Sequence, residues 1–301
     1  MGTGNRVAVV GAQGHTGRFV VDELLRRGFA VQPIGRADPL DLRDAAAVIN
    51  CAGPFAVTAG PVISAAIEAG IPYVDVAAEI EAITDTFTRF AGAPIPVVPA
   101  MAFFGGLADL LVSAVTGGAP VDEIDVAYGL SGWSPTPGTR TAGAVSRERR
   151  GGRRVRFTGG RLDYYRDDRD LPVVEWDFPP GPRPVLAGFT MAEVVTVPSH
   201  HEVGEIRTYM SVAAARELAS DAARGEPETF TVDVVVRAGG TRRRISVSGR
   251  DIYAVSAPLA VEAAERLLDG RNRSSGVLSA GAMFDARDFL DSLAGHLRLA
   301  L

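Results

Sequence analysis

Three glycines spaced three residues apart are the first part of this chain whose spacing suggests chemistry. Gly11, Gly14 and Gly17 follow an apolar, β-branched run at 6–10 and precede a stretch of helical periodicity that ends at Gly28. A strand, a glycine turn and a helix in this order place backbone N–H groups at a helix N-terminus, where they can bind a pyrophosphate. The spacing therefore predicts a dinucleotide site near the start of the chain.

Each glycine has a physical reason in such a site. Gly11 would make the tight turn, Gly14 would let the backbone approach the phosphates, and Gly17 would let the helix pack on the strand. Thr16 and Arg18 at the helix mouth could bind phosphate, or could be a helix cap and a solvated side chain. The predicted cofactor contacts in this turn are Gly11, Gln13, Gly14, His15, Thr16, Gly17 and Arg18.

The second strand, at 29–36, ends at Arg36. An arginine there accommodates the 2′-phosphate of NADP, whereas an acidic residue would bind the ribose hydroxyl of NAD. The sequence thus favours NADPH over NADH, unless Arg36 is an ordinary surface residue. Only thirteen residues separate Arg36 from Asn50, too few for two helical crossovers. We therefore expect an abbreviated sheet that lacks most of its second helix, with the second strand at or near an edge and with Asp41 and Leu42 against the adenine.

The next two strands should meet the same ligand with their carboxyl ends. In an open α/β sheet, ligands bind beyond these ends, where the strand order reverses. A short strand at 72–77 should deliver Tyr73, Asp75 and Glu79 to this rim. The strand at 46–50 is followed by the residues that should line the dinucleotide, namely Cys51, Ala52, Gly53, Pro54 and Phe55.

Hydride transfer needs a nicotinamide held against the acceptor carbon and, in most cases, a group that donates a proton. Tyr73, Asp75 and Glu79 stand at suitable strand ends, although core packing and helix capping would use the same residue types. His200 and His201 could instead supply an acid with a pKa near neutrality, or could be exposed loop residues. Their adjacent positions do not fit the spacing of a metal site, so we expect no bound metal.

The residues after Pro120 change in character. Strands and helices alternate before it, and helical patterns return at 257–268 and 286–299. These features predict an α/β domain with a Rossmann-type parallel sheet, formed by 1–120 and 250–301. The residues between, 121–249, predict an inserted α+β substrate domain with an antiparallel sheet. Its expected strands, which alternate in hydropathy and are joined by loops rich in Gly, Pro and Arg, are 121–130, 193–197, 206–212, 230–237 and 242–247.

Arginines crowd the beginning of this second region. One interpretation is a solvated loop, balanced by acidic residues nearby. The other is a clamp for an anionic substrate or for the tail of a cofactor. The arginines are Arg147, Arg149, Arg150, Arg153, Arg154, Arg156, Arg161, Arg166 and Arg169.

Composition excludes several classes of protein. The 301 residues include 47% hydrophobic ones and carry a net charge of −5, which argues against a general nucleic-acid binder. No apolar run is long enough to cross a membrane, and we expect a cytoplasmic protein. The single cysteine, Cys51, cannot form an internal disulfide, and the absence of lysine excludes a Schiff base and a lysine-containing phosphate-binding loop.

Several stretches of the sequence, taken together, resemble the saccharopine dehydrogenase-like oxidoreductases. They are 11–18, 50–55, 69–75 with Glu79, 104–109 and 276–279. The resemblance implies an NAD(P)-binding Rossmann domain with an inserted α+β substrate domain. It does not imply saccharopine as the substrate, because the pattern is shared by uncharacterised reductases, including relatives proposed to reduce enoyl or imine groups. The chain departs from the pattern in its shortened second-helix region and in its lack of lysine.

These observations favour an NADPH-dependent reductase of a C=N, C=C or C=O bond in a small-molecule substrate. The alternative is a non-catalytic sensor that binds NADP and regulates a partner, and a weaker third hypothesis is a redox-neutral isomerase with tightly held NADP. The second sheet makes a homodimer plausible.

Overall fold

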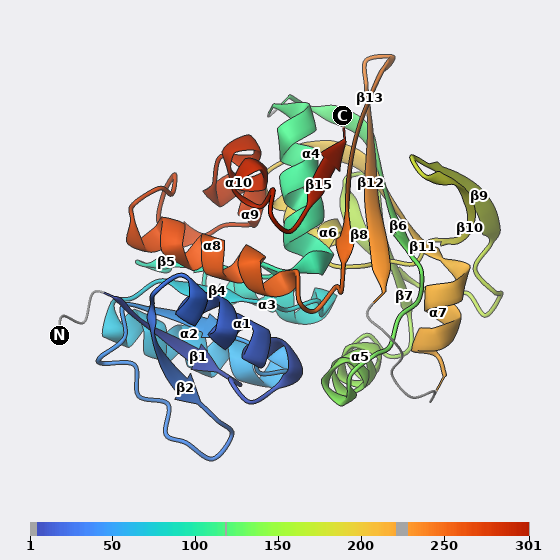
Figure 1. The fold of residues 1–301 in the computed structure, drawn as a ribbon. Coiled ribbons are helices and arrows are strands. Elements are labelled where there is room, and N and C mark those ends of the chain that lie inside the picture. The colour runs from blue at the N-terminus through green and yellow to red at the C-terminus, as the bar shows by residue number, and fades with distance from the viewer. Residues whose placement is uncertain (1–4, 118, 221–227, 301) are drawn as a thin grey trace.

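The first of two sheets is parallel and has six strands in the order β14-β5-β4-β3-β1-β2 (Figure 1). The computed structural model describes residues 5–117, 119–220 and 228–300. The strands are short, and those in the middle of the sheet are fully buried, as expected for parallel strands covered on both faces. Their bounds are β1 (Arg6–Val10), β2 (Ala30–Ile34), β3 (Ala47–Asn50), β4 (Tyr73–Asp75), β5 (Pro96–Val98) and β14 (Gly276–Val277).

Helices cover both faces of this sheet. The chain runs from β1 to β2 in one direction and from β3 to β5 in the other, so right-handed crossovers place the connecting helices on opposite faces. On one face α1 packs against α8, and on the other α2 packs against α3. The helices are α1 (His15–Arg26), α8 (Ser256–Leu268), α2 (Phe55–Ala69) and α3 (Ile80–Arg89).

The abbreviated sheet is confirmed. β2 lies at the edge and pairs with β1 alone, and residues 35–46, all of which the structure describes, contain no helix. Instead, this segment folds back on the sheet: the Gln32 side chain donates to the Asp41 carbonyl at 2.7 Å, and the Ala46 N–H donates to the Arg6 carbonyl at 2.8 Å. A thirteen-residue connection therefore suffices because one strand and one helix are missing.

The second sheet has a path of seven strands, with β7 and β8 attached beside it. It is mixed rather than wholly antiparallel as predicted, because β6 and β11 run parallel. A long connection through α5 (Pro137–Arg149) and two hairpins separates these two strands, which leaves room for a parallel crossover. The strands are β6 (Val121–Leu130), β7 (Arg154–Thr158), β8 (Arg161–Tyr165), β9 (Val173–Phe178), β10 (Gly181–Ala187), β11 (Val203–Ser211), β12 (Thr229–Ala238), β13 (Thr241–Arg250) and β15 (Arg298–Ala300).

Two predicted elements differ from the structure. Residues 193–197 form α6 (Glu193–Thr196) and the start of the short helix η3 (Val197–Ser199), not a strand, because a short buried apolar run fits either element. The last predicted helix is shorter, since α10 (Ala286–Ser292) ends early and β15 pairs with β13. The C-terminal segment thus joins the first sheet through β14 and the second through β15.

The remaining helices lie between the sheets or at their margins. The π-helix η2 (Phe103–Leu107) runs into α4 (Ala108–Thr116), which contacts β12 and β13 of the second sheet as well as α10. The short helices α7 (Val212–Leu218) and α9 (Ala280–Met283) complete the set that the structure describes. None of the helices in the described ranges has the length and apolar character needed to cross a bilayer.

Candidate active site

A cavity of about 2130 Å³ lies where the carboxyl edge of the first sheet faces α5. Its wall is formed by the ends of β1, β3 and β4, by α5, and by the loop before α8. The volume exceeds the roughly 300–1,000 Å³ that a single drug-sized ligand needs. The cavity therefore has room for a dinucleotide and a second small molecule.

The glycine turn opens onto this cavity. The Gly14 N–H donates to the Gly11 carbonyl at 2.9 Å, and Gly11 has a φ of +77°, which favours glycine. A Cβ on Gly17 would lie only 2.1 Å from the Gly11 oxygen, so the first turn of α1 can approach the turn only without a side chain there. Gly11, Gln13, Gly14, His15 and Thr16 line the cavity, whereas Gly17 is buried behind them and Arg18 is exposed outside the lining. These residues fit a bound pyrophosphate.

The edge of the cavity near β2 carries both an arginine and an aspartate. Arg36 is exposed, lines the cavity and makes no ion pair with any residue that the structure describes. Asp38 also lines the cavity, and its Oδ2 accepts a hydrogen bond from the Gly35 N–H at 2.7 Å. The Arg36 side chain could thus face a 2′-phosphate, while the Gly35 N–H holds the Asp38 carboxylate beside it.

The prediction that Asp41 and Leu42 face the adenine is wrong. The Asp41 carboxylate pairs with Arg43 at 2.5 Å, and Leu42 is buried in the core, because the loop folds back on the sheet. Neither residue lines the cavity, whereas Leu40, two positions earlier, does and is 36% exposed. The Arg43 guanidinium holds the pKa of the Asp41 carboxyl down at about 2.

Four of the five residues after β3 that were predicted to contact the dinucleotide line this cavity. Cys51, Ala52, Gly53 and Phe55 line the cavity, and Pro54, which follows a cis peptide bond, does not. Burial raises the pKa of the Cys51 thiol far above its usual value, so this cysteine stays protonated.

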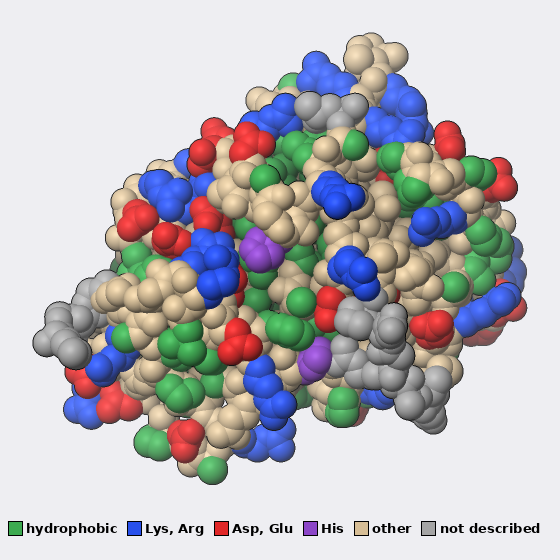
Figure 2. All heavy atoms as spheres, in the orientation of Figure 1, with side chains coloured by type: hydrophobic (Ala, Val, Ile, Leu, Met, Phe, Trp, Pro, Cys, Tyr) green, Lys and Arg blue, Asp and Glu red, His purple; other side chains and the backbone are tan. Residues whose placement is uncertain are grey.

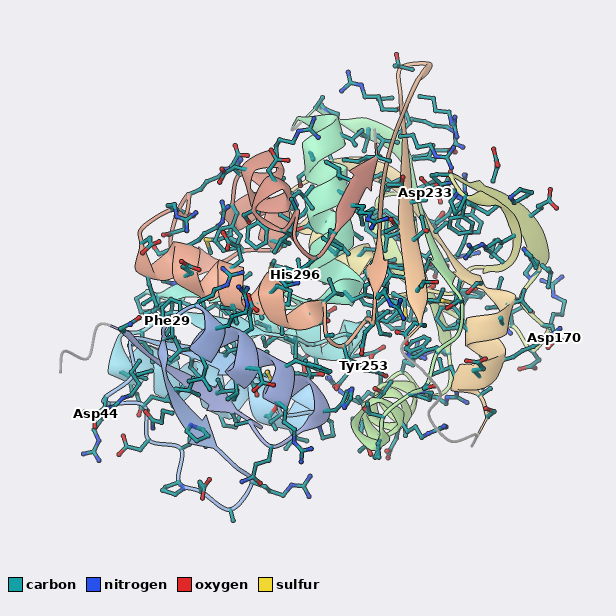
Figure 3. The ribbon with its side chains drawn as sticks, viewed as in Figure 1. Phe29, Asp44, Asp170, Asp233, Tyr253 and His296 are labelled. Carbon is teal, nitrogen blue, oxygen red and sulfur yellow. The ribbon has the colours of Figure 1, made fainter. Side chains whose placement is uncertain are left out.

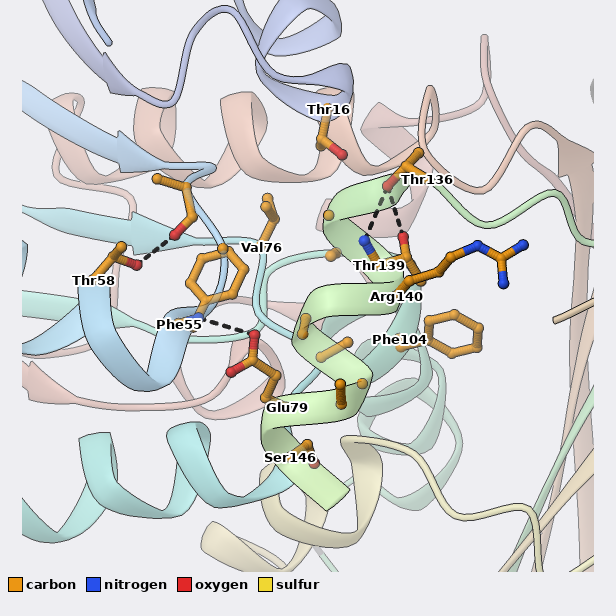
Figure 4. A pocket seen from close by; sticks show the side chains of 18 of the residues that line it. Thr16, Phe55, Thr58, Val76, Glu79, Phe104, Thr136, Thr139, Arg140 and Ser146 are labelled. Atoms are coloured by element: carbon orange, nitrogen blue, oxygen red, sulfur yellow. Dashed lines mark hydrogen bonds between the residues drawn. The ribbon is translucent and has the colours of Figure 1, made fainter. Parts of the chain in front are cut away.

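Glu79 lines the cavity but is already engaged. Its Oε1 accepts from the Phe55 N–H at 2.9 Å and its Oε2 from the Ala56 N–H at 3.1 Å, so the carboxylate caps the N-terminus of α2 (Figure 4). Burial raises its pKa above the usual range, and the two backbone hydrogen bonds oppose that effect. The geometry gives Glu79 a capping role within reach of the cavity.

Tyr73 and Asp75 lie behind the cavity wall, contrary to the expectation that they reach the rim. Both side chains are buried, and neither lines the cavity. Asp75 accepts from the Tyr73 hydroxyl at 2.9 Å, from the Ala77 N–H at 3.0 Å and from the Ala100 N–H at 2.8 Å. Burial raises the pKa of Asp75 to about 6 despite these hydrogen bonds. The carboxyl joins the end of β4 to the segment that follows β5.

The histidine pair also lies away from the cavity, which corrects its assignment as a proton donor. His200 Nε2 is 2.7 Å from Asp109 Oδ1, and His201 Nε2 is 3.1 Å from Ser113 Oγ. Both partners belong to α4, so the pair fastens the segment after η3 to that helix. Burial lowers the pKa of His201 to about 4. Within the described ranges, no group of three or more His, Cys, Asp or Glu side chains could hold a metal.

The sequence analysis missed Tyr253, a polar side chain that does face the cavity. Its hydroxyl accepts from Trp133 Nε1 at 3.1 Å and lies 2.9 Å from Thr139 Oγ1, while its ring lies edge-on to His15 with centroids 5.0 Å apart. It stands between the glycine turn and α5, where the chain leaves β13 for α8 (Figure 3). Only the fold brings these segments together, so no local signal could have identified this residue.

Helix α5 closes the cavity opposite the glycine turn. Thr136 caps it by accepting from the Thr139 N–H at 3.1 Å, and Thr136 lies across from Thr16 of α1 (Figure 4). At its other end, Ser146 donates to Glu81 of α3 at 2.5 Å. The cap followed by Pro137 is a helix start that the sequence displays, but this helix has no apolar face that would have marked it.

Of three comparisons with known proteins, the one with solved structures found matches, and they concern the fold. No family model and no curated protein matches the sequence. Among solved structures, the chain is similar to apo saccharopine dehydrogenase (L-Glu forming) from Saccharomyces cerevisiae, with a TM-score of 0.62 and 12% identity over 98% of this chain and 99% of that one.

Two further structures are similar over nearly their whole length. An engineered D-amino acid dehydrogenase bound to NADP+ has a TM-score of 0.49 and 14% identity, covering 96% of this chain and 98% of that one. The DAP dehydrogenase of C. glutamicum in complex with DAP has a TM-score of 0.49 and 14% identity, covering 97% and 99%. The first of these structures confirms, at the level of the fold, the resemblance noted in the sequence: this chain has a fold like that of saccharopine dehydrogenase.

Proposed function

We propose that this protein is an NADPH-dependent oxidoreductase that reduces a C=N, C=C or C=O bond in a small metabolite. The observation that carries the proposal is the glycine turn at the mouth of α1, whose backbone faces a cavity large enough for two ligands. Coarser support comes from the fold, which is that of NAD(P)-dependent dehydrogenases.

The residues present fit a dinucleotide. The turn from Gly11 to Thr16 would hold the pyrophosphate, Arg36 would hold the 2′-phosphate, and the segment after β3 would lie along the nicotinamide half. When bound, the reduced nicotinamide supplies hydride to the acceptor carbon and becomes oxidised, and a proton from a protein group or water completes the reduction. The protein must orient the acceptor and exclude water from the cavity.

The geometry narrows the choice of proton donor. Of the predicted donors, only Glu79 lines the cavity, and both of its oxygens already accept N–H groups. The Tyr253 hydroxyl at the cavity wall also accepts N–H groups, from Trp133 Nε1 and Thr136, but unlike the Glu79 carboxylate it carries a proton of its own, so we propose it as the donor. Tyr253→Phe should then lower kcat by about 10²-fold or more and remove one limb of its pH profile. An unchanged profile would assign the proton to another group.

The function is tested by binding and then by turnover. Fluorescence titration of the purified protein with NADPH and with NADH should show binding, with NADPH the tighter ligand. Oxidation of NADPH in the presence of a panel of imines, enones and ketones would then identify the bond that is reduced. Absence of binding by both nucleotides would overturn the proposal.

One observation favours a second candidate, the non-catalytic NADP sensor. Tyr73, Asp75, His200 and His201 all lie outside the cavity lining, so the site holds few acid groups. The size of the cavity favours the enzyme, because a sensor needs no room beside the nicotinamide. Tight NADPH binding without oxidation across the whole panel would favour the sensor. The cytoplasmic location, the homodimer, the lack of nucleic-acid binding and the division into domains stay predictions.

A further inference from the structure

The arginines of α5 and of the hairpin that follows divide into two groups. Three of those outside the cavity lining have carboxylate partners: Arg149 pairs with Asp85 at 2.7 Å, Arg156 with Asp163 at 2.8 Å, and Arg169 with Asp167 at 3.0 Å. These pairs match the interpretation of a solvated, balanced loop. On the surface seen in Figure 2, basic and acidic side chains are likewise mixed.

Five arginines of the same region line the cavity instead. Arg140 is near the start of α5, and we call the other four, Arg147, Arg150, Arg153 and Arg154, the arginine rim. Arg147 and Arg153 make no ion pair with any residue that the structure describes; Arg153 lies over the Tyr164 ring and donates to a backbone carbonyl. Arg150 lies 3.6 Å from Glu81, a distance too long for a good hydrogen bond. Arg150 still forms a loose ion pair with Glu81, so the positive charges of the rim without an ion pair among the described residues are those of Arg147, Arg153 and Arg154; Glu148, next to Arg147 in the sequence, also lines the cavity.

The charges of the whole lining agree with this imbalance. Among the described residues, six arginines and three carboxylates line the cavity, although the chain carries a net charge of −5. Two of those carboxylates, Asp38 and Glu79, already accept backbone N–H groups. A concave site with an excess of one charge attracts ligands of the opposite sign.

The cavity wall beside the rim is apolar and aromatic. The Phe104 ring contacts Trp133 at 5.2 Å between centroids, and Trp133 lies 6.4 Å from Phe189. Phe103 and Met191 line the same wall. Such a surface binds a hydrocarbon or aromatic body rather than a polyhydroxylated one.

The rim is also remote from the predicted phosphate site. Thr136, at the start of α5, faces Thr16 of the glycine turn, whereas Arg147 follows Pro137 by ten residues along the helix (Figure 4). At 1.5 Å per residue, these ten residues span about 15 Å. The rim therefore lies at the opposite end of α5 from the predicted phosphate site, far enough away to contact a different part of the bound ligands.

From these contacts we propose that the substrate is an amphiphilic anion: an apolar body that packs on Phe104, Trp133 and Phe189, with a carboxylate or phosphate group bound by Arg147 and Arg153. This inference rests on the proposed function because it places the substrate in the same cavity as the cofactor. It names the class of substrate that the proposed reductase would act on. Guanidinium groups suit both headgroups because their paired N–H donors match two oxygens.

The test uses Trp133 as its reporter. The chain contains two tryptophans, and Trp176 lies on the second sheet, hydrogen-bonded to Asp233 at 2.7 Å. In a Trp176→Phe background, emission reports on Trp133 alone, and the protein is titrated with decanoate, decyl phosphate, decanol and decylammonium. We expect both anions to bind at least about tenfold more tightly than decanol, since only they can form charge-assisted hydrogen bonds with the guanidinium groups. The tighter of the two anions identifies the preferred headgroup.

Matched variants separate the rim from general electrostatics. The double variant Arg147→Ala/Arg153→Ala should weaken decanoate binding at least about tenfold and leave decanol unchanged. Arg161→Ala removes a charge from the same hairpin, also without an ion pair among the described residues but outside the cavity lining, and should change neither. Decanol as tight as decanoate, decanoate affinity retained in the double variant, or no response of Trp133 to any probe would overturn the proposal.

A parallel NADPH titration of each variant keeps the two proposals distinct. NADPH affinity should be unchanged in the double variant, whereas a loss confined to NADPH would show that the rim binds the cofactor instead and would overturn the substrate assignment. If neither the unmodified protein nor any variant binds a nicotinamide nucleotide but decanoate binding depends on the arginine rim, the anion site stands and the reductase proposal fails.

Discussion

The ends of β1 and β4 lie at the same edge of the parallel sheet but serve different purposes. Beyond β1 the chain turns through glycines and leaves its backbone facing the cavity. At the end of β4 the side chains of Tyr73 and Asp75 turn inward, and Asp75 accepts hydrogen bonds from one hydroxyl and two backbone N–H groups. A place at the carboxyl edge of a sheet is therefore necessary for a ligand site but is not sufficient, because nearby backbone groups compete for the same side chains.

The largest effect on cofactor binding should follow from closing the β1 end. Gly17→Ala would place a Cβ 2.1 Å from the Gly11 oxygen, so the turn or the helix must move. We expect NADPH affinity to fall by more than about 100-fold, a loss of more than about 2.7 kcal/mol, and some stability to be lost. Gly92→Ala, where a Cβ meets nothing within 4 Å, is the control and should alter neither quantity. NADPH titration and thermal unfolding measure the two, and unchanged NADPH affinity in Gly17→Ala would break the comparison.

At the β4 end, the effect should be on stability instead. Asp75→Ala leaves three buried donors without their acceptor, each costing about 1–3 kcal/mol, so unfolding should require at least about 3 kcal/mol less free energy. Asp75→Asn keeps an amide oxygen for the two backbone N–H groups and should recover much of this loss. Urea unfolding measures both variants, and NADPH oxidation by the folded fraction should stay near the level of the unmodified protein. A folded Asp75→Asn protein without activity would instead return Asp75 to the list of catalytic groups.

The same comparison explains what the sequence could and could not predict. The glycine turn was identifiable because backbone recognition needs glycines at fixed local spacing. Tyr73 and Asp75 were placed correctly at a strand end, but their partners, the N–H groups of Ala77 and Ala100, depend on how the chain folds after β5. Tyr253 and the arginine rim face the cavity only because the second sheet returns the chain to the first. Local pattern therefore predicted most of the elements and the glycine turn, and long-range packing decided which other side chains face the cavity.

The end of β2 lies at the same edge of the sheet as the end of β1. A substitution of Arg36, which follows β2, tests whether this end binds the cofactor. Replacing Arg36 with Ala should weaken NADPH binding by about 10–100-fold, as expected from losing charge-assisted hydrogen bonds to a phosphate. NADH affinity should change little, because NADH lacks the 2′-phosphate. Paired titrations with the two nucleotides measure the ratio. An equal loss for both would show that Arg36 contacts a group they share.

The burial of Asp75 at the end of β4 should also change how the free energy of unfolding depends on pH. Burial raises the pKa of Asp75 from 3.8 to about 6, so the folded state binds this proton more tightly than the unfolded state. The stabilisation is complete below the unfolded pKa and is lost as the pH rises through the folded one. Relative to Asp75→Asn, the unmodified protein should lose about 1–2 kcal/mol of unfolding free energy between about pH 5 and pH 8. A gain over this range would show that the three hydrogen bonds outweigh burial.

The smallest effect should come from Asp38, which faces the open end beside Arg36. Its carboxylate repels the phosphates of a dinucleotide, but its Oδ2 also accepts from the Gly35 N–H at 2.7 Å. Asp38→Asn keeps an oxygen for that hydrogen bond and removes the negative charge, so NADPH should bind a few-fold more tightly, a gain below about 1 kcal/mol at an exposed site. The gain should shrink at high ionic strength, because salt screens exposed charges. If Asp38→Asn instead weakens NADH binding more than NADPH binding, the carboxylate contacts the ribose hydroxyls, and the β2 end is built for NAD rather than for the phosphate that Arg36 would bind.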